Sequence, residues 1–148
     1  MDMEEIIAVV SELDGVLVVV AEEESGLRHP ASGDAFFFSA PDGVLPERTQ
    51  PFGTITTKDT PGDQLSHLDR TGRFRVNVHV GRDRAATVAV PGGNPAEVDV
   101  VVPHPLYGAA GWVCVVNPAE RTSALVSTFL REARENARVR AIRRARGV

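Results

Sequence analysis

Strict alternation of apolar and polar residues over 73–81 constrains the fold of this chain more than any other feature of its sequence. The apolar positions are Phe74, Val76, Val78 and Val80, and the polar positions are Arg73, Arg75, Asn77 and His79. A period of two residues predicts a β-strand with one face in the core. The other face carries two guanidinium groups, an amide and an imidazole, so it is either a solvated sheet face or the floor of a binding site.

Further strands are expected to accompany this one. The segments are residues 16–21, 35–39, 52–57 and 111–117. The first is a continuous and mostly β-branched run, which predicts a strand covered on both faces. No stretch long enough for a crossover helix separates the segments that precede residue 81. These strands are therefore expected to form an antiparallel meander.

Helices are expected at both ends of the chain. Asp2 followed by Glu5 is typical of a capping box, and Gly15 is placed to end the helix that follows. A short helix is expected over 82–90. Asn117-Pro118 with Glu120 predicts the start of a last helix, which runs to about residue 140. Its apolar stripe comprises Leu125, Val126, Phe129, Leu130, Ala133 and Ala137.

Loops and turns complete the outline. Polar residues 22–33 are expected to form a loop, and Pro41-Asp42-Gly43 is typical of a tight turn. The fold class that follows is α+β, a mostly antiparallel sheet with an N-terminal helix and a long C-terminal helix packed on it. A single domain over residues 1–148 is expected from the length.

Charge and cysteine content narrow the class of protein. The chain has a net charge of −4 and one cysteine, Cys114. It lacks a basic leader, and none of its apolar runs approaches the length of a membrane span, so a cytoplasmic protein without membrane association is expected. Residues 1–63 hold thirteen acids and three bases, whereas residues 64–148 hold seven acids and thirteen bases. This asymmetry indicates either a solvated basic helix end or an interaction surface.

The loop Pro103-His104-Pro105-Leu106-Tyr107-Gly108 contains the first candidate catalytic groups. A residue before proline avoids helical backbone angles, so the two prolines hold His104 extended and restrict its imidazole. A fixed imidazole suits a general base or a ligand contact. The catalytic candidates are therefore His104, Tyr107 and, from the alternating strand, His79. The alternative is a structural loop whose side chains bind the backbone.

The alternating strand supplies the candidate ligand-binding groups. Arg75 and Asn77 share a face with His79, and an arginine can hold a carboxylate or phosphate with two hydrogen bonds. Lys58 and Asp59, which follow the strand over 52–57, are added to this set. Trp112 is either a packing anchor or a ligand contact. The spacing of His67, Asp69, His79 and His104 matches no metal motif, so neither a metal nor a cofactor is expected.

Arginines in the last helix support a different hypothesis. Seven arginines lie between residues 131 and 146. Arg131, Arg134, Arg138 and Arg143 are the candidates for contact with nucleic acid. Glu132 and Glu135 dilute this basic surface.

The order of these segments resembles that of the MmcQ/YjbR-like proteins, which are small α+β domains. The resemblance rests on an N-terminal helix ending near Leu13-Asp14-Gly15, the strand over 75–80, and the Gly111-Trp112-Val113 strand before a long helix. It implies this fold and DNA binding through a double-wing motif. Residues 51–59, the strand 73–81 and the loop and strand over 103–113 are more similar to a bacterial family defined only as a domain of unknown function.

Three functions are compatible with the sequence. The leading hypothesis is a small anionic ligand bound in a cleft floored by the sheet. If the protein is an enzyme, it would use cofactor-free acid/base chemistry, with His104 or His79 carrying the proton and Arg75 binding the oxyanion. The second is nucleic-acid binding through the arginine-rich helix. The third is a structural or partner-binding protein without a small-molecule site.

Overall fold

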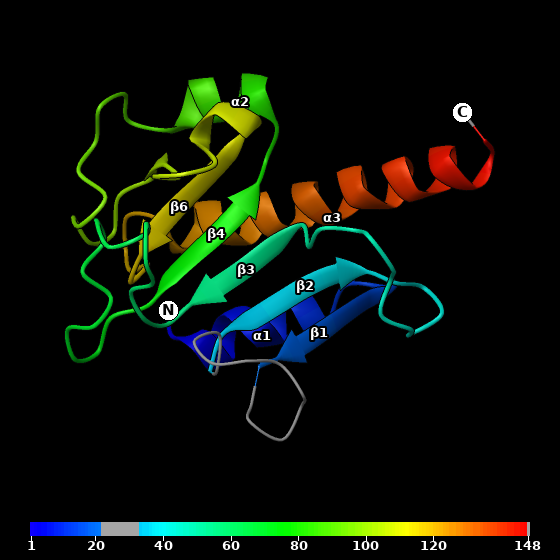
Figure 1. The fold of residues 1–148 in the computed structure, drawn as a ribbon, viewed down its shortest axis with the longest axis horizontal. Helices are drawn as coiled ribbons and strands as arrows, with labels where there is room; N and C mark the ends of the chain where they lie inside the picture. Colours follow the sequence, from blue (N-terminus) through cyan, green and yellow to red (C-terminus); the bar gives the residue numbers. More distant parts are fainter. Residues whose placement is uncertain (22–32, 148) are drawn as a thin grey trace.

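An antiparallel sheet forms the centre of the computed structural model, which describes residues 1–21 and 33–147 (Figure 1). Six strands are present in this part of the chain, in the spatial order β1-β2-β3-β4-β6-β5, and every neighbouring pair is antiparallel. Their bounds are β1 Val16–Val20, β2 Ala35–Ser39, β3 Gly53–Thr56, β4 Arg75–His79, β5 Val102–Pro103 and β6 Trp112–Val116. The expected meander is confirmed by β1 to β4. The loop expected over 22–33 lies outside the described residues except for Gly33.

The position of β1 differs from the expectation. In the described part of the chain the strand lies at the edge of the sheet, its first four residues are only partly buried, and Val20 is 37% exposed. The prediction that both of its faces are covered is therefore wrong. A β-branched run fits any pleated surface and does not distinguish an edge strand from a central one. The two-residue strand β5, which pairs with β6, was not expected from the sequence.

The helices are α1 Met3–Ser11, α2 Arg82–Val88 and α3 Ser123–Ala145, with a short 3-10 helix, η2, over Gly108–Ala110. The capping box is confirmed, because Asp2 accepts a hydrogen bond from the Glu5 backbone N–H at 2.8 Å and Glu5 accepts one from that of Asp2 at 3.2 Å. Gly15 does not end α1, which has Glu12 as its C-cap. With φ +70°, Gly15 instead makes the turn into β1, where an added Cβ would lie 3.5 Å from Pro41.

The start of α3 also differs from the expectation. The helix begins at Ser123 and not directly after Asn117. The Asn117 side chain serves the sheet instead, accepting from the Phe74 N–H at 3.0 Å and donating to the Gly72 carbonyl at 3.0 Å. Asp99 binds the chain that enters α3, accepting from the backbone N–H groups of Ala119 at 2.8 Å, Arg121 at 3.0 Å and Thr122 at 3.0 Å. A cap supplied from so far along the chain has no local sequence signal.

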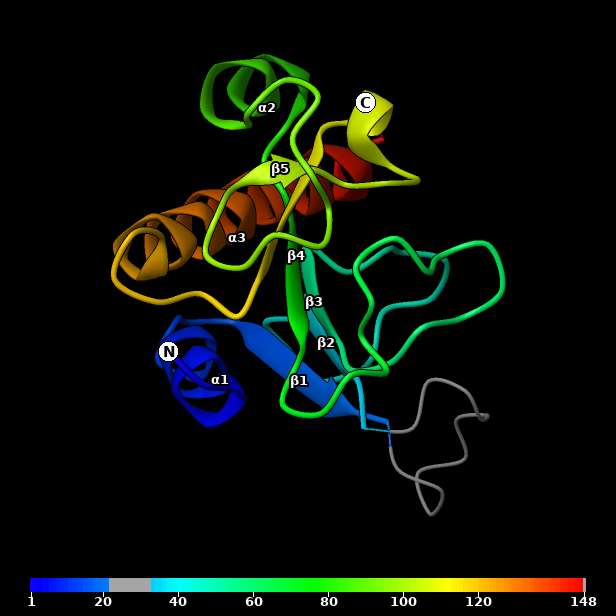
Figure 2. The ribbon, with the colours of Figure 1, turned by 90° about the vertical axis from the view of Figure 1, so that its left-hand side faces the viewer.

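The two longer helices cover one face of the sheet, and the β2–β3 and β3–β4 loops lie on the other (Figure 2). The face beneath the helices forms the core, in which Ile6 and Val10 of α1 pack with Ile55, Val76, Val78, Phe129 and Leu130. In the part of the chain that the structure describes, no helix combines the length and apolarity needed to cross a membrane. The expected α+β fold, with the N-terminal and C-terminal helices packed on an antiparallel sheet, is confirmed.

Candidate functional site

Two residues on the polar face of β4, Arg75 and Asn77, are buried beneath a cavity. Arg75 is 1% exposed and Asn77 is 2% exposed. Above them is a cavity of about 300 Å³, which we call the sheet cavity. Its lining comes from β3 (Thr54, Thr56), β4 (Arg75, Asn77), β6 (Trp112) and the connecting segments (Gln50, Pro51, Asp63, His104, Tyr107, Ala110). The strand therefore has one face in the core and the other beneath a pocket.

Arg75 uses its whole guanidinium within the protein. Nε donates to Asn77 Oδ1 at 2.7 Å, and Nη1 donates to Asp63 Oδ1 at 2.9 Å and to Ser66 Oγ at 3.1 Å. Nη2 donates to Asp63 Oδ2 at 2.7 Å and faces His104 Nε2 at 3.2 Å. A guanidinium has five N–H groups, of which four donate to Asn77, Asp63 and Ser66 and the fifth faces His104. Every N–H group of Arg75 is therefore directed at a protein atom.

Asp63 neutralises the buried arginine. It lies in the loop between β3 and β4, where its backbone pairs with Thr60. The bidentate hydrogen bonds from Arg75 hold the pKa of the Asp63 carboxyl below its usual value, against the effect of burial. The carboxylate is therefore ionised at neutral pH, and the pair contributes no net charge to the cavity floor.

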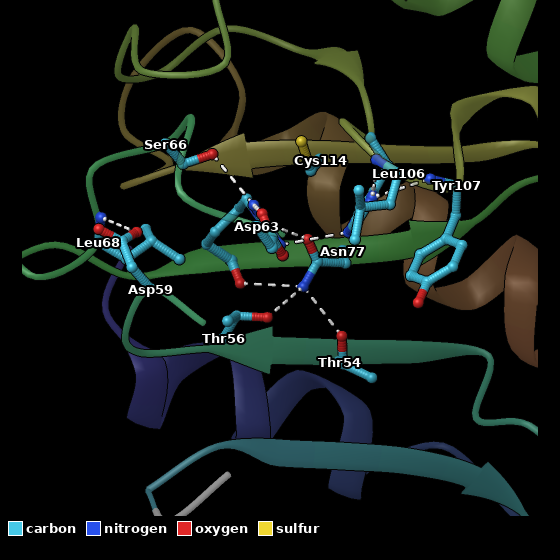
Figure 3. Close-up of polar contacts among 12 residues, drawn as sticks. Thr54, Thr56, Asp59, Asp63, Ser66, Leu68, Asn77, Leu106, Tyr107 and Cys114 are labelled. Atoms are coloured by element: carbon cyan, nitrogen blue, oxygen red, sulfur yellow. Dashed lines mark hydrogen bonds and ion pairs between the residues drawn. The ribbon is translucent and has the colours of Figure 1, made fainter. Parts of the chain in front are cut away.

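Asn77 fixes two hydroxyl groups on the neighbouring strand. Its Nδ2 donates to Thr54 Oγ1 at 2.9 Å and to Thr56 Oγ1 at 2.9 Å, as Figure 3 shows. The antiparallel register places Thr54 opposite Asn77, and alternation puts Thr56 on the same face. Because each hydroxyl oxygen accepts from Asn77, its own proton points elsewhere. Both hydroxyls line the cavity and are donors for a bound molecule.

His104 is surrounded by hydrogen-bond donors. The side chain is 6% exposed, and its Nδ1 accepts from the backbone N–H groups of Leu106 at 3.1 Å and Tyr107 at 3.1 Å. Its Nε2 faces Nη2 of Arg75 at 3.2 Å. Burial and, next, the charge of Arg75 lower the pKa of His104 to about 4, although Asp63 opposes this shift. The imidazole is neutral at pH 7. Because Nδ1 accepts, the single ring proton lies on Nε2, and a second proton on Nδ1 would meet the two backbone N–H groups.

The structure brings together only some of the residues singled out from the sequence. Arg75, Asn77, His104, Tyr107 and Trp112 all line the sheet cavity, and the rings of His104 and Tyr107 lie 4.9 Å apart.

Lys58 and Asp59 do not line this cavity. Asp59 organises the loop that follows it, since its carboxylate accepts from the Leu68 N–H at 2.8 Å and its own N–H donates to Asp69 at 3.0 Å.

His79 occupies a second cavity. It shares the face of Arg75 and Asn77, but its Nε2 lies 3.1 Å from the Ala110 carbonyl oxygen and its ring lies 5.4 Å from that of Trp112. It lines a neighbouring cavity of about 440 Å³, which we call the basic cavity. Gln50 contributes to both cavities. The other residues that line the basic cavity are Ser39, Arg48, Thr49, Ala137, Arg140, Ala141 and Arg144.

The α3 arginines chosen from the sequence lie elsewhere. Arg138 pairs with Glu135 at 2.6 Å, and Arg134 approaches the same carboxylate at 3.6 Å. Arg131 and Arg143 are exposed. None of these four arginines lines either cavity.

The remaining reactive groups are placed structurally. Burial raises the pKa of the Cys114 thiol to about 12, so it is protonated at neutral pH. Among residues 1–21 and 33–147 there is no cluster of three or more histidine, cysteine or acidic side chains that could hold a metal ion.

Sequence reasoning missed several of the residues that build these sites. Thr54 and Thr56 had a signal, because polar residues alternate with Ile55 in a strand predicted to pair with β4. Asp63 had none, since nothing local marks a loop acid as the partner of a strand arginine. Arg140 and Arg144 were seen only as part of a basic helix end.

Comparison with known proteins gives one match. A model described as a family of unknown function, DUF6194, matches residues 1–146. No curated protein matches the chain, and no solved structure matches it.

Proposed function

We propose a function from the geometry of the sheet cavity, because the chain belongs to DUF6194, a family of unknown function. The proposal is that the protein binds a small polar organic molecule there. The observation that carries it is the buried network of Arg75, Asp63, Asn77 and His104, which lies directly beneath a cavity of ligand size. Burying an ion pair is costly, and a strand that needed only a core would carry apolar residues here. A pre-ordered polar floor with fixed hydroxyls is what a binding site requires.

The chemistry of the lining indicates the class of ligand. Arg75 and Asp63 cancel in charge, so the floor does not favour an anion. The hydroxyls of Thr54 and Thr56 are available donors, and the Asp63 carboxylate keeps acceptor capacity beyond its two bonds to Arg75. Tyr107 and Trp112 supply aromatic surface. We therefore infer an uncharged or zwitterionic ligand with a flat apolar part.

This proposal revises the anionic-ligand hypothesis drawn from the sequence. That hypothesis used Arg75 as the anion clamp, whereas all five of its N–H groups face protein atoms. The surroundings of His104 likewise favour a binding role over proton transfer, since both ring nitrogens face donors and the pKa of the ring is lowered to about 4.

Trp112 provides the test, because it lines the cavity and is the single tryptophan of the sequence. A panel of small uncharged, zwitterionic and anionic compounds would be titrated while its fluorescence and the melting temperature are followed, since ligands of the folded state raise that temperature. Ala110→Phe would place an aromatic ring at the cavity, and Ala109→Phe is the matched control because both alanines are exposed but Ala109 lies outside the cavity. Binding should be lost in the first variant and kept in the second. Equal binding by both variants would contradict the proposal.

Nucleic-acid binding has less support. Two of the four candidate arginines, Arg134 and Arg138, share the counter-ion Glu135. The relationship to MmcQ/YjbR-like proteins, and the DNA binding that it implies, stays a prediction. The cytoplasmic location expected from the lone cysteine also stays a prediction. Chromatography on a DNA column at rising salt concentrations would test the nucleic-acid hypothesis, since phosphate contacts weaken steeply with salt.

A further inference from the structure

The basic cavity holds arginines without counter-ions in the described structure. Arg48, Arg140 and Arg144 line it together with His79, and its lining contains no acidic side chain. The ion pairs formed within residues 1–21 and 33–147 involve Arg75, Arg84, Arg134 and Arg138, and none involves these three arginines.

The contrast within α3 makes this arrangement specific. Arg134 and Arg138 are four residues apart, and Glu135 lies between them and pairs with both. Arg140 and Arg144 are also four residues apart, so they lie on the same side of the helix, but the residues between them are Ala141, Ile142 and Arg143. Burial and, next, the charge of Arg144 lower the pKa of Arg140. Like charges gathered around a surface cavity favour the binding of an anion.

His79 adds a group that can respond to an anion. Its Nε2 lies 3.1 Å from a backbone carbonyl oxygen, which can only accept, so Nε2 carries the ring proton and Nδ1 does not. Nδ1 is buried and has no hydrogen-bond partner among the described residues. Burial and, next, the charge of Arg140 lower the pKa of His79. A bound anion would offset that charge and would favour the protonated, cationic form of the ring.

We propose that the basic cavity binds a phosphate monoester, with Arg140 and Arg144 of α3 and Arg48 of the β2–β3 loop contacting its oxygens. Guanidinium groups suit phosphate because each can donate two parallel hydrogen bonds. The cavity volume of about 440 Å³ leaves room for an organic group beyond the phosphate itself. Thr49 and Gln50 add polar side chains to the same lining. This site does not depend on the ligand proposed for the sheet cavity.

Calorimetric titration with phenyl phosphate, inorganic phosphate and phenol would test the proposal at constant ionic strength. The test variant is Arg140→Gln with Arg144→Gln, and the matched control is Arg131→Gln with Arg143→Gln, which removes the same charge from positions of the same helix that line neither cavity. The test variant should lose at least about tenfold in affinity for phenyl phosphate, the loss expected for one charge-assisted hydrogen bond, and the control should not. Melting temperatures of both variants would confirm that they fold.

Each outcome decides the question. Tighter binding of phenyl phosphate than of inorganic phosphate, with no binding of phenol, supports a monoester site. Equal affinity for the two phosphates would reduce the site to one for the free ion and would overturn the monoester assignment. Equal losses in the test and control variants would show that the general charge of α3 binds anions, as a nucleic-acid surface would, and would overturn the cavity site.

Measuring anion affinity at several pH values would test the role of His79 separately from that of the arginines. Sulfate keeps the same charge between pH 5 and 8, so it is the probe for this arm. The charged residues that line the cavity with His79 are Arg48 from the β2–β3 loop and Arg140 and Arg144 from α3. Sulfate should bind more tightly as the pH falls, because binding is coupled to protonation of His79, and His79→Gln should bind with little pH dependence. A pH-independent affinity in the unmodified protein would exclude His79 from the site.

Discussion

Protonation of His104 should destabilise the fold between pH 7 and pH 5. The pKa of this side chain falls from 6.5 to about 4 on folding, so the unfolded chain binds more protons than the folded protein between these values. Stability is therefore lost as the pH falls through this window. The difference in proton binding lowers the free energy of unfolding by about 2 kcal/mol between pH 7 and pH 5. The loss reaches about 3 kcal/mol once the pH is below both pKa values of His104. The lowered pKa of His79 acts in the same direction.

His104→Asn isolates this contribution. An asparagine side chain can still accept from the N–H groups two and three residues later, and it does not titrate. Urea unfolding followed by Trp112 fluorescence would give the free energy of unfolding at pH 7 and pH 5 for both proteins. The unmodified protein should lose about 2 kcal/mol more than the variant over this interval, since the contributions of His79 and other groups cancel in the comparison. Equal losses in the two proteins, or an NMR titration of His104 with a pKa near 6.5, would refute the reasoning.

Three further substitutions test the supports of the site by urea unfolding at pH 7. Asp63→Asn leaves the guanidinium of Arg75 buried without its counter-ion. The free energy of unfolding should therefore fall by about 3–5 kcal/mol. A loss below about 1 kcal/mol would contradict the bidentate pairing. Asp99→Ala removes the acceptor for three backbone N–H groups before α3 and should cost about 1–2 kcal/mol, whereas an unchanged stability would show that α3 begins without it. Gly111→Ala places a Cβ 2.6 Å from the Gly81 backbone at a residue with φ +94°, so it should cost more than about 1 kcal/mol, and a neutral result would mean that the two backbones do not approach closely.

The sequence predicted the strands better than it predicted what covers them. The alternation over 73–81 identified β4, and Asp2 with Glu5 identified the start of α1, because both patterns are local. It could not show that the polar face of β4 is buried, since that depends on the folding of the β3–β4 loop and on the segment with His104. Local patterns predict which residues share a face, and contacts with residues distant in the sequence decide whether that face is exposed to solvent.

The start of α3 shows that a local sequence signal can be present without being used in the structure. Asn117-Pro118 has the residues of a helix start, and a local signal was present, yet the structure uses the asparagine side chain to join β4 and β6. Asp99 then provides the acceptor for the chain that enters α3. A capping residue competes for several partners, and only the tertiary structure decides which of them it binds.

The arginines differ in role because their carboxylates differ in position. Arg134 and Arg138 have Glu135 beside them in the helix, so their pairing can be read from the sequence. Arg75 obtains Asp63 from a loop twelve residues away, which turns a candidate anion clamp into a neutral cavity floor. Arg140 and Arg144 line a cavity that has no acid in its lining. Net charge near a cavity, and not the number of arginines, determines where an anion can bind, so the basic cavity is favoured over the floor of the sheet cavity.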